Sequence, residues 1–199
     1  MRDIAAALDY WPSPPPWGWK ADDLGLLPPE GPNGEPGFFE HVELLGGALV
    51  FEAPESPFHE RAIHGIARSL GAQSPDHCTV AVRMHVKLGH RMRPRPDVLV
   101  AGSPADGGRT CYLPDEVLLA VEVMSPELGP RDRRWKPLCY ANAGIPHLWR
   151  VEEKDGRPVV YVYELDPATR AYVATGIHRG ELSVPVPFRI GIDLDALVR

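Results

Sequence analysis

The sequence predicts a mixed α/β fold in which helices flank a central sheet. Three observations support this: strict apolar alternation over residues 80–88, a continuous apolar run over 117–125, and apolar residues at helical spacing over 56–70. The chain has 199 residues, of which 44% are hydrophobic and 24% are charged. That is enough for one globular, soluble domain with a sizeable core.

Residues 1–37 are richer in proline, glycine and tryptophan than the rest of the chain. The run Trp11–Trp19 contains four prolines, and proline lacks the amide that a helix needs. We therefore expect an extended Pro/Trp-rich arm over residues 1–37, with a short helical turn over 21–27, and a folded domain over residues 38–199.

The folded domain is expected to begin with a hairpin and a helix. Within residues 38–52, apolar residues flank Gly46-Gly47, which is a turn signal between two strands. Ser56 is a good N-cap, Pro57 suits the first helical position, and Gly71 can end a helix. The first helix should therefore span residues 56–70.

The middle of the chain predicts three strands, over residues 80–88, 97–101 and 117–125. The first should be half-buried with a basic outer face, and the third should lie at the centre of the sheet. A second helix should begin near Asp132 and end by Gly144, with Pro137 forcing a late start or a kink. Further strands are expected over 147–152, 158–165 and 171–178, then an extended segment over 185–190 and a short helix over 193–198.

Composition narrows the classes of function. A net charge of -6 argues mildly against a nucleic-acid-binding protein. No apolar run is long enough to span a membrane, and the N-terminus lacks a signal-peptide pattern, so we expect a cytoplasmic protein. The three cysteines form no CxxC pair, so neither a zinc knuckle nor a disulfide framework is predicted.

Positive charge is concentrated in two stretches. Residues 77–96 contain five lysines or arginines and no acid, and residues 131–136 contain four, with Asp132 as their one acid. This asymmetry would suit a site for phosphate groups. The alternative is a solvated sheet edge that is protected by lysine and arginine.

Two carboxylates, Asp97 and Glu122, belong to apolar runs. Burying an ionised carboxylate without a partner is costly, so each must meet a cation, a hydrogen-bond network or a metal. If their strands are neighbours, the two can converge and share a divalent cation such as Mg²⁺, with Lys136 nearby. The alternative is that each pairs with one of the nearby arginines.

Several motifs together carry a family resemblance. They are Arg95-Pro96-Asp97-Val98, Glu122-Val123-Met124-Ser125-Pro126, the series Asp132, Lys136, Tyr140 and Leu148-Trp149, and the hairpin around Glu43. With His59 at the helix entry, the chain resembles the Uma family of putative restriction endonucleases, in the PD-(D/E)XK nuclease superfamily. The resemblance implies a restriction-endonuclease-like fold and phosphodiester hydrolysis by a metal-activated water.

The resemblance also implies the metal ligands. Asp97 and Glu122 would bind Mg²⁺ or Mn²⁺, with the main-chain carbonyl of Val123 and the carboxylate of Glu43 as further ligands. His59 and Asp132 would be accessory residues; for His59, a capping or core role is the alternative.

The catalytic lysine is where this sequence departs from the superfamily, which places it two residues after the glutamate. That position is Met124 here, and the resemblance implies that Lys136 on the following helix replaces the lysine. Lys136 as a solvated helix cation is the alternative. We expect Tyr140 and Trp149 to lie in the core.

Two interpretations follow for function. The first is a Mg²⁺-dependent endonuclease acting on DNA, expected to work as a homodimer because two strands need two sites. The second is a catalytically inactive nuclease-fold module that binds nucleic acid or a protein partner. A metal-dependent hydrolase of a smaller phosphoester is a third, weaker option.

Overall fold

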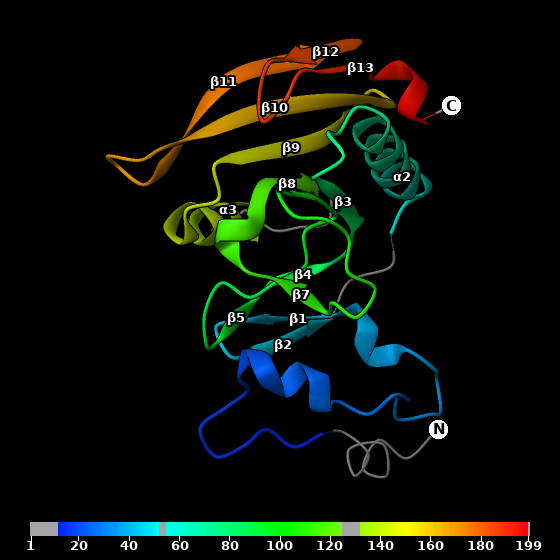
Figure 1. Ribbon diagram of the computed structural model, residues 1–199. Coiled ribbons are helices and arrows are strands. Elements are labelled where there is room, and N and C mark those ends of the chain that lie inside the picture. Colours follow the sequence, from blue (N-terminus) through cyan, green and yellow to red (C-terminus); the bar gives the residue numbers. More distant parts are fainter. Residues whose placement is uncertain (1–11, 52–54, 125–131, 199) are drawn as a thin grey trace. The chain divides into compact units, whose positions relative to one another are not determined.

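A computed structural model of the chain describes residues 12–51, 55–124 and 132–198, without the side chains of residues 132 and 133 (Figure 1). The chain packs into two compact units, residues 1–54 with 89–94 and residues 55–88 with 95–199. The boundary at residue 37 between arm and domain stays a prediction. Residue 125, the last of the strand expected over residues 117–125, lies outside the described residues. No helix in the described ranges is long and apolar enough to cross a membrane.

The first unit contains a small antiparallel sheet and two short 3-10 helices. Its elements are η1 (Ala21–Leu26), η2 (Phe38–His41), β1 (Val42–Leu45), β2 (Ala48–Phe51) and β5 (Met92–Arg93), and β1 is the middle strand. The predicted hairpin is confirmed as β1 and β2, which join at Gly46 and Gly47. Both glycines have a positive φ, 64° and 86°, which glycine adopts without steric cost.

The second unit is built on an eight-stranded mixed sheet (Figure 1). In spatial order its strands are β13 (Ile190–Asp193), β12 (Glu181–Val184), β11 (Ala171–Arg179), β10 (Arg157–Asp166), β9 (His147–Lys154), β8 (Val117–Val123), β6 (Val98–Ala101) and β3 (Thr79–Val82). Only the central pair, β8 with β9, is parallel among these strands. The remaining elements are β4 (His85–Val86) paired with β7 (Cys111–Tyr112), η3 (Pro114–Glu116) and η4 (Asp195–Val198).

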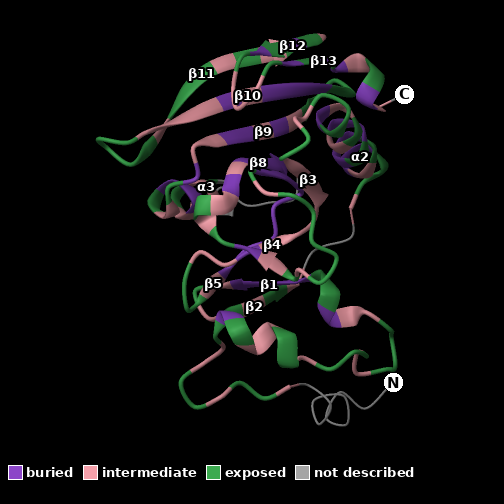
Figure 2. Cartoon of the chain, in the orientation of Figure 1, coloured by how far each residue is buried: buried purple, intermediate pink, exposed green. Residues whose placement is uncertain are grey.

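Two helices pack against this sheet, α2 (Pro57–Gly71) and α3 (Asp132–Ala143). The inward residues of α2 join one face of the central strands in one hydrophobic cluster, whereas Tyr140 of α3 joins the other face in a second cluster. Every residue of β8 except Leu118 is buried, whereas β9 and β10 are buried over part of their length (Figure 2). Alternate residues of each strand therefore face different helices. The start of α2 follows the sequence, because the Ser56 side chain accepts a hydrogen bond from the amide of His59.

The structure differs from the expected elements in three respects. The strand expected over residues 80–88 is broken into β3 and β4 at Arg83, which has a φ of 51°. The Arg83 amide still donates to the carbonyl oxygen of Asp97, as the β3–β6 register requires, and its side chain bonds to Glu55 and Glu60. The short strands β5, β7, β12 and β13 were not predicted. Of the two alternatives for Pro137, the late start of the second helix does not occur, because Pro137 lies inside α3.

The packing of α2 predicts opposite effects for two glycines of that helix. A Cβ at Gly65 would lie 2.9 Å from Cδ2 and 3.1 Å from Cα of Leu197 in η4, whereas a Cβ at Gly71 meets nothing within 4 Å. We expect Gly65→Ala to lower the free energy of unfolding by about 1–3 kcal/mol, because the clash outweighs a propensity gain of about 1 kcal/mol. Gly71→Ala should be neutral or slightly stabilising. Urea denaturation checks both, and equal effects of the two changes would contradict the packing argument.

Candidate metal centre

Asp97 and Glu122 lie at one end of the central sheet. Strands β6 and β8 are antiparallel with Val98 opposite Val121, so continuing this register by one residue places Asp97 opposite Glu122. Facing residues of an antiparallel pair point to the same side, with Cβ atoms about 5 Å apart. Both residues are nearly buried, with 9% and 8% of their surface exposed. The structure therefore brings together the two carboxylates that the sequence singled out.

Glu122 is held by two residues of α3. The hydroxyl of Tyr140 donates to its Oε1 at 2.6 Å, and Nζ of Lys136 lies 3.2 Å from its Oε2. Lys136 and Tyr140 are four residues apart, so one face of α3 presents both to the carboxylate. Lys136 is thus not simply a solvated helix cation. Met124 follows β8, and its amide donates to the carbonyl oxygen of Val151.

Asp97 is held from the strand end and from α2. Its Oδ2 accepts a hydrogen bond of 2.6 Å from the Val123 amide and lies 3.7 Å from Nε2 of His59. That same Nε2 donates to the carbonyl oxygen of Val123 at 2.8 Å. His59 is buried near the start of α2, and its ring is directed at the backbone and carboxylate of the candidate centre.

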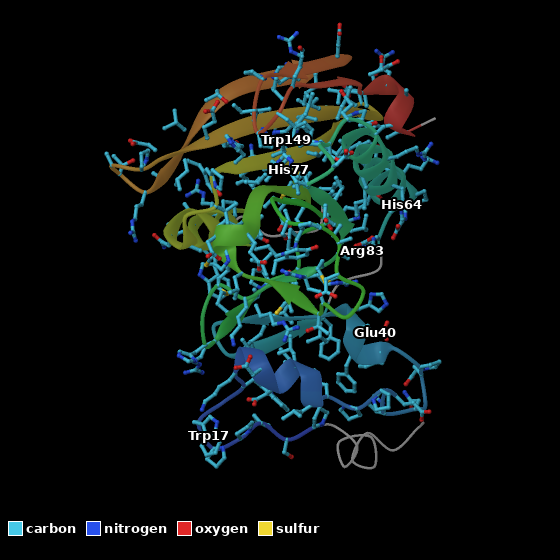
Figure 3. The ribbon with its side chains drawn as sticks, in the orientation of Figure 1. Trp17, Glu40, His64, His77, Arg83 and Trp149 are labelled. Atoms are coloured by element: carbon cyan, nitrogen blue, oxygen red, sulfur yellow. The ribbon has the colours of Figure 1, made fainter. Side chains whose placement is uncertain are left out.

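Glu55 and Arg83, which the sequence did not single out, lie on the same side as His59. Nδ1 of His59 lies 3.0 Å from Oε2 of Glu55, and Arg83 pairs with both Glu55 and Glu60, the latter at 2.6 Å. Figure 3 labels Arg83, on the segment between β3 and β4. The one signal in the sequence is the spacing of four residues between Glu55 and His59, which suits a pair at a helix start.

Burial and neighbouring charges together shift the pKa values of Asp97, Glu55 and His59. Burial raises the pKa of Asp97 to about 6, although the charges of His59 and Lys136 oppose the shift. Burial also opposes ionisation of Glu55, but contacts with His59 and its other polar neighbours outweigh it and lower the pKa of Glu55 to about 2. The pKa of His59 is raised, because the Glu55 and Asp97 carboxylates outweigh its burial.

Two sets of atoms in this region could hold a metal ion. Ligand atoms of Glu55, His59 and Asp97 lie within 4.8 Å of one another, but Nε2 of His59 already donates to the Val123 carbonyl, while its Nδ1 lies 3.0 Å from Glu55 without a hydrogen bond. A second candidate set is the oxygen atoms of Asp97, Glu122 and the Val123 carbonyl. That carbonyl keeps a second lone pair beside the bond from His59. Carboxylate and carbonyl oxygens fit a hard divalent cation.

The sequence singled out four further residues. Glu43 is buried on β1, opposite Val50, in the first compact unit. Asp132 begins α3, but its side chain lies outside the described part of the structure. Tyr140 and Trp149, the latter labelled in Figure 3, are both fully buried, as expected for core residues.

Comparison with known proteins supplies the family. The family model described as "Uma2: Putative restriction endonuclease" matches residues 39–196. The chain belongs to the Uma2 family. Among solved structures, it is similar to a putative nuclease belonging to DUF820 from Anabaena variabilis, with a TM-score of 0.60 and 15% sequence identity over 90% of this chain and 99% of that one. A search of curated proteins finds no match.

Uma2 membership agrees with the geometry of the centre. The structural similarity confirms the predicted fold class, a mixed sheet flanked by helices. Family and fold together support a nuclease. The individual roles of the Uma2 residues named above, from Asp97 to Lys136, are a matter of proposal.

The raised pKa of Asp97 predicts that metal binding by this Uma2 protein depends on pH. Below a pH of about 6 the Asp97 carboxyl holds a proton, which a cation must displace, so the apparent affinity for Mn²⁺ should fall by up to about tenfold per pH unit. Above pH 6 the affinity should level off. Isothermal titration with Mn²⁺ between pH 5 and pH 8 measures this. Asp97→Asn is the control, and a wild-type affinity that stays constant across this range would contradict the assignment.

Proposed function

We propose that the protein is an endonuclease that requires Mg²⁺ or Mn²⁺ and hydrolyses phosphodiester bonds in DNA. The observation that supports it best is the position of Lys136, 3.2 Å from the Glu122 carboxylate that faces Asp97. A nuclease of this superfamily needs two carboxylates and a cation together. Met124 cannot provide the cation, and Lys136 can.

The proposed ligands are Asp97, Glu122 and the Val123 carbonyl, with Glu43 retained as a further one. A bound divalent cation would supply Lewis-acid polarisation of the phosphate and a water of lowered pKa. The near burial of both carboxylates raises the strength of charge interactions there, because less water screens them.

The protein side chains have separate roles in this proposal. The Lys136 ammonium would stabilise negative charge on the phosphate or orient the attacking water, while Tyr140 fixes the direction of the Glu122 carboxylate. His59 would hold the Val123 carbonyl and Asp97 in place, as an accessory residue that positions ligands. Asp132 is kept as a second accessory residue.

DNA is the proposed substrate because lysine and arginine are concentrated in the stretches around the two carboxylates. We expect a homodimer, since cleavage of both strands of a duplex needs two centres, and light scattering of the purified protein tests that. A cytoplasmic location would agree with a DNA substrate.

Substitution of the centre should abolish cleavage of a supercoiled plasmid in Mg²⁺ or Mn²⁺. Asp97→Ala and Glu122→Ala remove ligands, so we expect activity to fall to background. Lys136→Met should lower kcat about 10²–10³-fold, because it removes one donor at the developing charge, and Lys136→Arg should retain part of the rate. Gel analysis of nicked and linear products measures each rate. Lys20→Met, an exposed lysine of the first unit, is the matched control.

The outcomes separate the proposed function from the alternatives. Cleavage that survives both Asp97→Ala and Glu122→Ala would refute this centre. DNA binding without any cleavage by the wild-type protein would favour the inactive binding module, for which the absence of a lysine at position 124 is the specific argument. Hydrolysis of a small phosphodiester but not of plasmid DNA would favour the third option.

A further inference from the structure

A row of four residues crosses the sheet next to the candidate metal centre. In the strand registers, Glu122 of β8 pairs with Arg150 of β9, Arg150 pairs with Tyr161 of β10, and Tyr161 pairs with Ile177 of β11. Figure 1 shows β8 to β11 as successive strands of the sheet. Paired residues of neighbouring strands share a face, about 4.8 Å apart. Arg150 is therefore the next residue beyond Glu122 on the face that carries both carboxylates.

The guanidinium of Arg150 is fixed by its neighbours. It lies over the ring of Tyr161 at 4.6 Å and near the ring of Tyr163 at 5.7 Å, and its Nε is 3.0 Å from Oε1 of Glu152. Cation–π contacts of this kind hold an arginine in one orientation without using its terminal donors. Arg150 is thus pre-organised from one side.

The other side of the same guanidinium is available to a ligand. In the described part of the chain neither Nη nitrogen donates a hydrogen bond. Of the guanidinium nitrogens only Nε is buried, close to Glu152 but without a hydrogen bond, so both Nη nitrogens reach solvent. Glu152 does not cancel the charge, because its Oε2 also pairs with Lys154 at 2.9 Å. Arg150, Glu152 and Lys154 together keep one net positive charge.

We propose that Arg150 binds a DNA phosphate that neighbours the scissile phosphate along the bound strand. A planar guanidinium with two open Nη donors matches the oxygen atoms of a phosphate. Arg150 lies one β-strand away from Glu122. A DNA strand bound at Glu122 would continue past this position. The ring of Tyr161 and the side chain of Ile177, which is 54% exposed, extend the row with apolar surface for a sugar or base.

This inference rests on the proposed function, because it takes DNA as the substrate. It adds a substrate-binding residue that lies outside the motifs of the metal centre. A purely structural Arg150, which only packs on the two tyrosines, is the competing interpretation, and the experiment must separate the two.

The test measures binding of a fluorescein-labelled DNA duplex by anisotropy over a series of salt concentrations, with Ca²⁺ in place of Mg²⁺. Arg150→Met keeps the length of the side chain and removes the charge. We expect on the order of tenfold weaker binding at low salt and a slope of log K against log salt that is smaller by about one, as for the loss of one phosphate contact. Arg150→Lys should keep the wild-type slope. Arg170→Met, in the exposed turn between β10 and β11 at the far end of the strands, should change neither quantity.

Mn²⁺ affinity of the same variants, measured by isothermal titration, distinguishes the two interpretations. Loss of DNA affinity with unchanged Mn²⁺ affinity supports the phosphate contact. Unchanged DNA affinity and slope in Arg150→Met, or a parallel loss of Mn²⁺ affinity in both Arg150→Met and Arg150→Lys, would overturn it. If the wild-type protein neither binds nor cleaves DNA, the proposed function itself is refuted. If the wild-type protein binds DNA and Arg150→Met binds it equally well, only the role of Arg150 is refuted.

Discussion

The structure of the second unit depends on one electrostatic constraint, the pair of nearly buried carboxylates at Asp97 and Glu122. Their strands place them opposite each other, where two full charges about 5 Å apart would repel by about 3 kcal/mol at an effective dielectric constant of about 20. Burial has already raised the pKa of Asp97 to about 6. A basic side chain lies near each carboxylate: His59 of α2 is 3.7 Å from Asp97, and Lys136 of α3 is 3.2 Å from Glu122.

This constraint joins the packing of the helices to the chemistry of the site. The inward face of α2 packs on one cluster of the sheet while His59, near its start, reaches Asp97 and the Val123 carbonyl. On the other cluster, the fully buried Tyr140 both anchors α3 and donates to Glu122. A change that shifts either helix therefore also moves a charge at the centre, so core packing and site geometry are not independent here.

The sequence predicted the elements that nearby residues specify. It missed features that depend on contacts between residues far apart in the chain. The cap at Ser56 and the glycine pair at 46 and 47 specify the helix α2 and the hairpin, because each signal acts within a few residues. At Arg83 the alternation of apolar residues continues, and no neighbouring residue indicates that the strand ends. Its strand ends there, where Arg83 has a φ of 51°, and the side chain bonds to Glu55 and Glu60, which are 28 and 23 residues away in the sequence. Asp97 and Glu122 stand out as acids in apolar runs, whereas Glu55 carries only the weaker signal of its four-residue spacing to His59. The roles of Glu43 and Asp132 stay predictions.

The absence of a lysine at position 124 has a structural consequence. Residues 122 and 124 of an extended chain point to the same side, so a lysine at 124 would take its position from the strand itself. Lys136 instead depends on the docking of α3, and Tyr140, one turn later, binds the same carboxylate as Lys136 does. The hydroxyl of Tyr140 thus links the position of α3 to that of the Glu122 carboxylate. The docking of α3 places Lys136 at Glu122, because the two α3 residues contact both oxygens of that carboxylate.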